Sequence, residues 1–138
     1  MDQDLRIAII VNPELPLGLI ANTASAIAIG LGARLPALGN PPLTDSDRKV
    51  LDTSSNRPVP VLQAPPDVIA VAMRRALPIP DNAAVVPFPA FARALHDFNE
   101  YLEVFPEKTL DSEVIDGLGL AGPSQWVRSL TGSLKLLR

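Results

Sequence analysis

Apolar and polar positions along the chain divide it into alternating strands and helices. A β-branched run over residues 5–11, ended by Asn12-Pro13, predicts a buried strand followed by a turn. Similar apolar runs predict three further strands, over residues 59–63, 83–88 and 114–120. Because helical patterns separate these strands, we expect one α/β domain over residues 1–138. Its sheet should have about four strands, mixed or largely parallel, flanked by helices.

Four segments have the spacing of helices. Residues 17–31 are Ala-rich and almost free of charge, which predicts a helix buried around most of its circumference and ended by Gly30-Leu31-Gly32. Pro65-Pro66-Asp67 opens a second helix through Leu77. A third helix is predicted from an apolar stripe with spacings of 3, 4, 3, 4 and 3: Phe88, Phe91, Leu95, Phe98, Leu102 and Phe105. A short final helix should follow Gly122-Pro123 and end at Gly132.

The segment from Pro36 to Pro60 is the least regular part of the chain. It contains Gly39-Asn40-Pro41-Pro42 and a polar run over residues 52–56, both typical of loops. We expect a long surface loop with room for a small hairpin, and no domain boundary there.

Composition narrows the function classes. The 138 residues are 47% hydrophobic and 20% charged with a net charge of -3, which describes a folded domain with one core. The sequence pI of about 5.0 argues against a nucleic-acid partner. With no cysteine and only His96, disulfides, thiolate sites and histidine-based metal sites are not expected. We expect neither a metal nor a cofactor. We also expect no signal peptide and no membrane span, and hence a cytoplasmic location.

Most charged positions look like ordinary solvated groups. Arg93 falls off the phenylalanine stripe toward solvent, and His96 is expected to be a surface or partly buried structural residue. Solvated carboxylates are expected at Asp45 and Asp47, at Glu100 and Glu103, and at Asp111, Glu113 and Asp116. Asn22 and Ser25 lie one turn apart on the first helix. They either pack locally or form a pocket wall at the end of the first strand, where open α/β sheets bind ligands.

The C-terminal segment over residues 118–137 has the most specific pattern. It resembles the signature of type II peptidyl-tRNA hydrolases, an apolar strand, Gly-Pro, a short helix and Thr-Gly-x-Leu-Lys-Leu. The residues Ile9 to Asn12, Leu15, Gly18 and Ala21-Asn22 look like that family's first strand, turn and helix. The chain is more similar still to an uncharacterised bacterial domain family grouped with this fold. That similarity covers nearly the whole chain, through Asn12, Leu15-Pro16-x-Gly18-Leu19, Ala21-Asn22, residues 30–33, residues 60–62 and residues 130–133. The resemblance implies a peptidyl-tRNA hydrolase II-like fold.

The hydrolytic residues of the resembled enzymes do not carry over. Their turn lysines align with residues 16–20, which contain none, and their histidines align with Ser25 and Ser133. Their acidic positions align with Gln125 and Arg128, while Lys135 remains. Hydrolysis needs oxyanion stabilisation and phosphate contacts. We therefore expect an atypical member that binds a small polar ligand or a protein partner without hydrolysing peptidyl-tRNA.

The ligand-binding candidates should share one rim at the end of the first strand. They are Asn12, Asn22, Ser25, Thr131, Ser133 and Lys135. One alternative is a hydrolase that uses Thr131, Ser133 and Lys135 on a small ester or amide, and another is a divergent peptidyl-tRNA hydrolase.

We also expect a homodimer. The first helix is apolar nearly all round, and the sheet can cover only one side of it. The other side requires either the loop over residues 36–60 or a symmetry mate. The resembled hydrolases, which are typically dimers, favour the symmetry mate.

Overall fold

A computed structural model describes residues 4–138 and shows one five-stranded mixed sheet. The strands are ordered β5-β6-β1-β4-β7, and only β1 and β4 run parallel to each other. Their bounds are Leu5–Val11 (β1), Val61–Gln63 (β4), Ala84–Pro89 (β5), Ile115–Pro123 (β6) and Lys135–Leu136 (β7). The predicted α/β class is confirmed. The sheet is mostly antiparallel, and the apolar tail adds β7, an edge strand that the sequence pattern did not predict.

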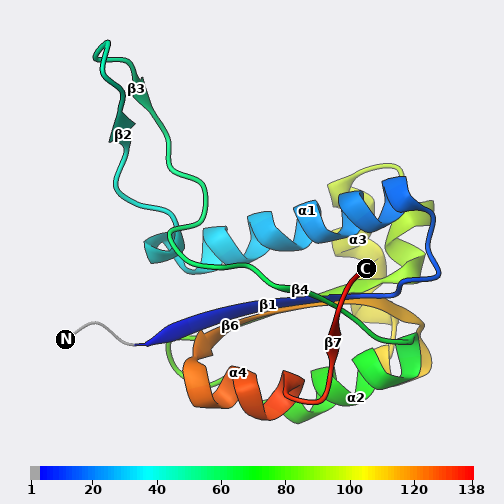
Figure 1. Cartoon of the computed structure of the whole chain (residues 1–138). Coiled ribbons are helices and arrows are strands. Elements are labelled where there is room, and N and C mark those ends of the chain that lie inside the picture. The colour runs from blue at the N-terminus through cyan, green and yellow to red at the C-terminus, as the bar shows by residue number, and fades with distance from the viewer. Residues whose placement is uncertain (1–3) are drawn as a thin grey trace.

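Helices cover both faces of the sheet (Figure 1). Helix α1 (Leu17–Arg34) lies on one face, while α2 (Pro66–Ala76) and α4 (Ser124–Thr131) lie on the other. Side chains of β1 alternate between two cores, so Ile7 and Ile9 point toward α1 while Ala8 and Ile10 point toward α2 and α4. The predicted second and final helices are confirmed.

Two glycines of β6 bring α1 unusually close to the sheet. A Cβ added at Gly119 would lie 2.2 Å from Cγ2 of Ile27, and one at Gly117 would lie 2.6 Å from Cγ2 of Thr23. Only hydrogen therefore fits at these two positions. The contact fixes which face of α1 is buried.

Helix α1 differs from its prediction in two ways. It continues through Gly30 and Gly32 to Arg34, because neither glycine adopts the positive φ of a helix stop. Only Thr23, Ile27 and Leu31 are buried, so the expected burial around most of the circumference is wrong. The sheet covers one side of α1, and the opposite side is exposed. By length and composition alone α1 could cross a membrane, but its Ile27 and Leu31 side chains belong to the apolar core between α1 and the sheet.

The single helix predicted over residues 88–105 is wrong. Strand β5 continues through Phe88, which pairs with Gly117, and is followed by a 3-10 helix, Ala90–Ala94. Helix α3 (Phe98–Val104) begins anew because the Asp97 carboxylate caps it, accepting a hydrogen bond from the Glu100 N–H at 2.9 Å. The residues of the regular apolar stripe therefore belong to separate elements. Two further 3-10 helices, Phe105–Glu107 and Leu110–Ser112, lead into β6.

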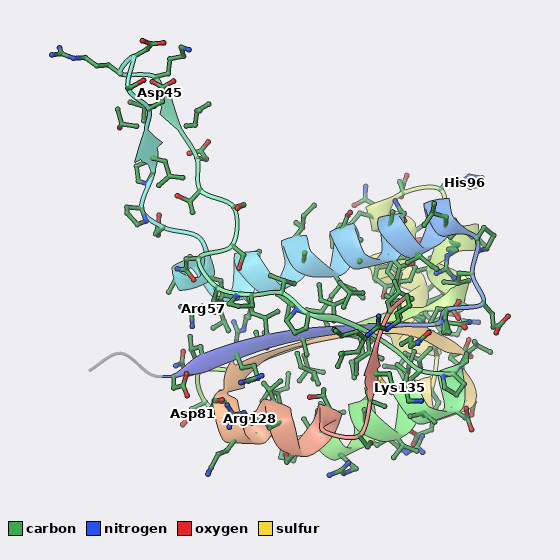
Figure 2. All side chains as sticks on the ribbon, in the orientation of Figure 1. Asp45, Arg57, Asp81, His96, Arg128 and Lys135 are labelled. Atoms are coloured by element: carbon green, nitrogen blue, oxygen red, sulfur yellow. The ribbon has the colours of Figure 1, made fainter. Side chains whose placement is uncertain are left out.

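The predicted loop contains the small hairpin that was expected. Strands β2 (Leu43–Thr44) and β3 (Val50–Leu51) pair within a segment that projects from the body, residues 40–56, here named the arm (Figure 1). A 3-10 helix, Pro36–Leu38, connects α1 to the arm, and the Asn56 N–H donates to the Leu38 carbonyl at 2.9 Å. Asp45 lies on the arm, while Arg57 lies where the arm joins the body (Figure 2). Backbone N–H donors of Lys49 and Asp47 lower the pKa of Asp45.

Candidate functional site

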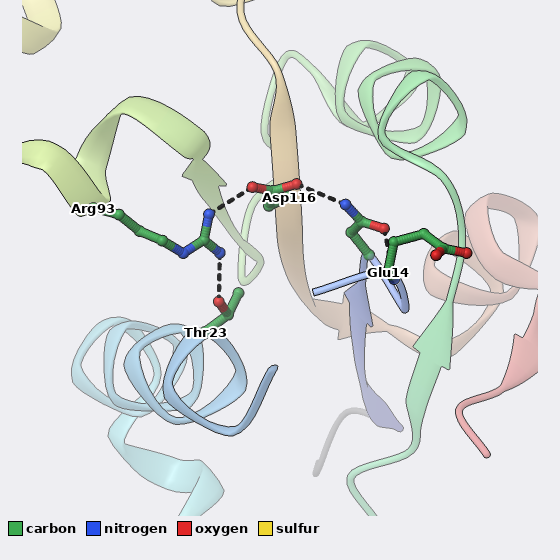
Figure 3. A network of polar contacts seen from close by, with 5 residues as sticks. Glu14, Thr23, Arg93 and Asp116 are labelled. Atoms are coloured by element: carbon green, nitrogen blue, oxygen red, sulfur yellow. Dashed lines mark hydrogen bonds and ion pairs between the residues drawn. The ribbon is translucent and has the colours of Figure 1, made fainter. Parts of the chain in front are cut away.

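A cluster of hydrogen-bonded polar side chains closes one end of the sheet (Figure 3). Asn12 follows β1, and its Nδ2 donates to Asp116 Oδ1 of β6 at 3.0 Å. Arg93 reaches in from the 3-10 helix after β5, donating from Nη1 to Asp116 Oδ2 at 2.5 Å and from Nη2 to Thr23 Oγ1 of α1 at 2.8 Å. These four residues, Asn12, Thr23, Arg93 and Asp116, are named the polar cluster. They join β1, α1, β6 and the 3-10 helix after β5, so that the two N-terminal segments are held to two segments far along the chain.

The polar cluster is buried. Asp116 is only 4% exposed, and the Arg93 side chain is 20% exposed. The guanidinium carbon of Arg93 lies 5.0 Å from the centre of the Phe88 ring, and the buried Nε of Arg93 has no hydrogen-bond partner among residues 4–138. Because each charge is balanced by the other, the pair is suited to holding the surrounding segments rather than to attacking a substrate.

The sequence analysis placed Arg93 and Asp116 in solvent, and both predictions are wrong. Asp116 is the only charged residue within β6, and a charge inside a buried strand is a sign that a partner is present. Its partner could not be identified from sequence because Arg93 was assigned to a helix that does not form. His96 is exposed, as expected.

An apolar groove of about 560 Å³ lies beside the polar cluster, between α1 and the segment that ends in α3. Phe88 connects the two features, because one side of its ring meets Arg93 and the residue also lines the groove. We name this cavity the α1–α3 groove. Its lining residues are Ala26, Ile27, Ile29, Gly30, Val86, Pro87, Phe88, Ala92, Leu95, Asp97, Phe98 and Tyr101.

Aromatic rings form the outer wall of the α1–α3 groove. Ring centres lie 5.4 Å apart for Tyr101 and Phe105, 6.0 Å for Tyr101 and Phe91, and 6.5 Å for Tyr101 and Phe98. Burial raises the pKa of the Tyr101 hydroxyl above its ordinary value. Phe98 is 67% exposed, so this wall offers aromatic surface to an incoming molecule.

The floor of the groove is the edge strand β5, which is protected against strand addition. Pro87 and Pro89 have no N–H to offer an added strand. A bound molecule therefore finds no backbone donor at either proline. A cavity of similar size, about 590 Å³, lies between the start of β1 and residues 57–60, but no aromatic side chain lines it.

The predicted site residues do not share one set of contacts. Asn12 belongs to the buried polar cluster, whereas Asn22 and Ser25 are exposed on α1, where Ser25 Oγ donates to the Ala21 carbonyl. Thr131 ends α4 and donates to the Val127 carbonyl. Because α1 and α4 cover opposite faces of the sheet, Asn22 and Ser25 lie on the other side from Thr131 (Figure 1).

The remaining two candidates lie in the C-terminal tail. Ser133 is exposed in the turn after α4, and Lys135 is exposed on β7, opposite Gln63. No hydrogen bond described for residues 4–138 joins the six candidates to one another. In the same part of the chain, no group of three or more His, Cys, Asp or Glu side chains could hold a metal ion.

Fold and site together define a small α/β domain with a five-stranded mixed sheet and an aromatic-walled groove beside α1. Over residues 5–138 the sequence matches the family described as Protein of unknown function (DUF2000), and the chain belongs to that family. A solved structure of a protein of unknown function from Agrobacterium tumefaciens str. C58 is similar, with a TM-score of 0.86. It is 20% identical over 96% of this chain and 97% of that chain, which shows a shared fold. No curated protein matches the chain.

Proposed function

We propose that this domain binds a small molecule with an apolar body in the α1–α3 groove, and that it does not hydrolyse peptidyl-tRNA. The groove carries this proposal. Its volume of about 560 Å³ falls within the roughly 300–1,000 Å³ of small-molecule sites, which are also mostly apolar with a few polar groups.

The lining of the groove indicates what kind of molecule fits. The aromatic wall and the apolar face of α1 favour a flat ring or an aliphatic chain. Asp97 and the Tyr101 hydroxyl are the polar groups among the lining residues. Since one is acidic and neither is basic, the polar end of the ligand should be neutral or cationic. The sequence led us to expect a small polar ligand, and the groove revises that expectation toward a molecule that is largely apolar.

The proposed absence of peptidyl-tRNA hydrolysis rests on chemistry and charge. We take the fold to be peptidyl-tRNA hydrolase II-like because the segment with the resembling signature forms a strand, a short helix and a final strand in that order, β6, α4 and β7. Residues 16–20, where the resembled enzymes have their turn lysines, contain no lysine for phosphate contacts, and the net charge of -3 opposes attraction to tRNA. The domain should therefore fail to rescue cells that lack peptidyl-tRNA hydrolase. Rescue at ordinary expression levels would overturn this half of the proposal.

Binding in the groove can be measured with Nile red, a neutral apolar dye whose emission rises in apolar surroundings. We expect saturable binding to the wild-type protein. Ala26→Trp places a large ring in the groove and should weaken binding at least tenfold. Ala21→Trp is the matched control, since Ala21 is also exposed on α1 but does not line the groove.

Competition then identifies the ligand class. Neutral and cationic aromatic compounds should displace Nile red and raise the melting temperature, while their carboxylate analogues should do neither. If the wild type does not bind the dye, or if Ala26→Trp binds it as well as Ala21→Trp, the groove is not the site. Displacement by anionic compounds alone would contradict the proposed ligand charge.

A further inference from the structure

The side of α1 that faces away from the sheet is uncharged and is not covered by any part of residues 4–138; its exposed polar side chains are Asn22 and Ser25. Leu17 is 81% exposed and Ile29 is 74% exposed, although both are large hydrophobic residues. No charged side chain occurs on α1 before Arg34. A continuous uncharged helix face of this length is typical of a surface that another molecule covers.

The arm carries exposed apolar side chains that no other part of residues 4–138 covers. Leu43, Val50 and Leu51 are exposed by 57%, 66% and 61%, and together they occupy three of the four strand positions of the hairpin. Two strands of two residues each do not form a stable hairpin on their own. The arm therefore needs a surface to pack against, and residues 4–138 of its own chain do not supply one.

The arm and the exposed face of α1 are placed so that one partner molecule can contact both. The arm rises from the C-terminal end of α1, on the side of the sheet that α1 covers, so that the two enclose an open angle (Figure 1). The sequence analysis left two ways of covering the outer face of α1, the loop or a symmetry mate. In the structure the loop extends away from that face, which favours the symmetry mate.

We propose that a second copy of this chain occupies this angle. The two α1 helices pack antiparallel about a two-fold axis near Ser25, the midpoint of the outer face, and each arm lies along the partner's α1. A two-fold interface uses the same patch twice and must be self-complementary. The outer face of α1 meets this condition because it has no charge to repel its own copy.

The area of the interface explains why the arm is needed. An 18-residue helix is about 27 Å long and about 10 Å wide, which makes a narrow strip. A specific interface covers about 800 Å² of accessible surface on each partner. The apolar side chains of the arm enlarge the contact at both ends of the helix pair. Removing them should therefore dissociate the dimer even though α1 is unchanged.

Sedimentation velocity at micromolar concentration tests the dimer and the role of the arm. We expect the wild type to sediment with twice the chain mass of 14.7 kDa. Val50→Asp should weaken the dimer at least tenfold. Val114→Asp is the matched control, because Val114 is also an exposed valine, at 54%, but lies outside the arm and α1. Circular dichroism should show that both variants keep the wild-type secondary structure.

Cross-linking locates the axis, because the natural chain has no cysteine to interfere. Ser25→Cys should form a disulfide-linked dimer under mild oxidation. Ser129→Cys is its control, since both serines are exposed on helices and each hydroxyl donates to a carbonyl of its own helix at 2.7 Å. Ser129 lies on α4, across the sheet from α1.

Three results would overturn the proposal. The first is a wild-type monomer, the second is equal dissociation of the Val50 and Val114 variants, and the third is equal cross-linking at Ser25 and Ser129. A wild-type monomer that binds phosphatidylcholine vesicles would instead assign the face of α1 to a membrane surface. Val50 and Ser25 do not line the α1–α3 groove, so their variants leave its lining unchanged and Nile red binding is scored separately.

Discussion

Replacing Asp116 by alanine should destabilise the domain strongly, because it leaves a buried arginine without its counter-ion. The Arg93 guanidinium, on a side chain only 20% exposed, would keep Thr23 as its hydrogen-bond partner and would have no balancing charge. The Asn12 amide would also lose its acceptor. Removing one member of a buried ion pair costs about 3–5 kcal/mol. Since Arg93 retains some access to water, we expect about 3 kcal/mol, a large part of a total stability of about 5–15 kcal/mol.

The matched control is Asp111→Ala, which breaks an exposed ion pair. Asp111 lies 3.7 Å from Arg74, and the two side chains are 64% and 47% exposed. Solvent screens such a pair, so its loss should cost no more than about 1 kcal/mol. Both variants can be compared by urea unfolding, followed by the fluorescence of Trp126, the single tryptophan of the chain.

A double variant separates the lost charge balance from lost packing. Arg93→Met combined with Asp116→Leu replaces the ion pair by apolar side chains of similar size and should recover part of the stability lost in Asp116→Ala. If Asp116→Ala is no less stable than Asp111→Ala, the polar cluster does not stabilise the packing of its four segments.

Three further predictions concern the elements around the groove. Gly119→Ala should destabilise the domain by about 1–3 kcal/mol because the added Cβ would meet Ile27, whereas Gly32→Ala, with open space around it, should stabilise α1 by about 0.5–1 kcal/mol. If thermal unfolding ranks the two variants in the opposite order, α1 is not in close contact with the sheet at Gly119. Asp97→Ala removes the cap of α3 and should cost about 1 kcal/mol, seen as faster amide exchange in α3, and unchanged exchange there would argue against the cap. Burial raises the pKa of Tyr101, so the neutral hydroxyl contributes to folding stability below pH 10.0, and this contribution is lost as the pH rises through the folded-state pKa. Absorbance titration of this single tyrosine should show a raised midpoint in the folded protein and an ordinary midpoint in urea.

The elements with strong local signals could be predicted from the sequence. The β-branched run of β1, the prolines that open α2, and the Gly122-Pro123 step before α4 act through their own backbone preferences, which the fold leaves unchanged. The hairpin of the arm belongs to the same group, since a run of prolines, asparagine and aspartate excludes longer elements. The α/β class follows from these elements in order.

Tertiary contacts decided the remainder of the fold. The stripe from Phe88 to Phe105 has a helical period, yet Phe88 pairs with Gly117 in the sheet, and the pairing outweighs the local preference. Strand β7 has only two residues and exists because β4 leaves an edge for it. Helix α1 shows the same limit, because its apolar pattern could not distinguish burial in a core from exposure at a surface.

The candidate site was the least predictable part, for a physical reason. Arg93 and Asp116 are 23 residues apart, and nothing in their local spacing brings them together. Their ion pair forms because β5 and β6 align side by side and place both residues at the same end of the sheet. The groove likewise needs α1 and α3, whose side chains line it together only after the chain has folded. Local sequence determined which elements form, and the packing of distant elements decided which of their side chains became a site.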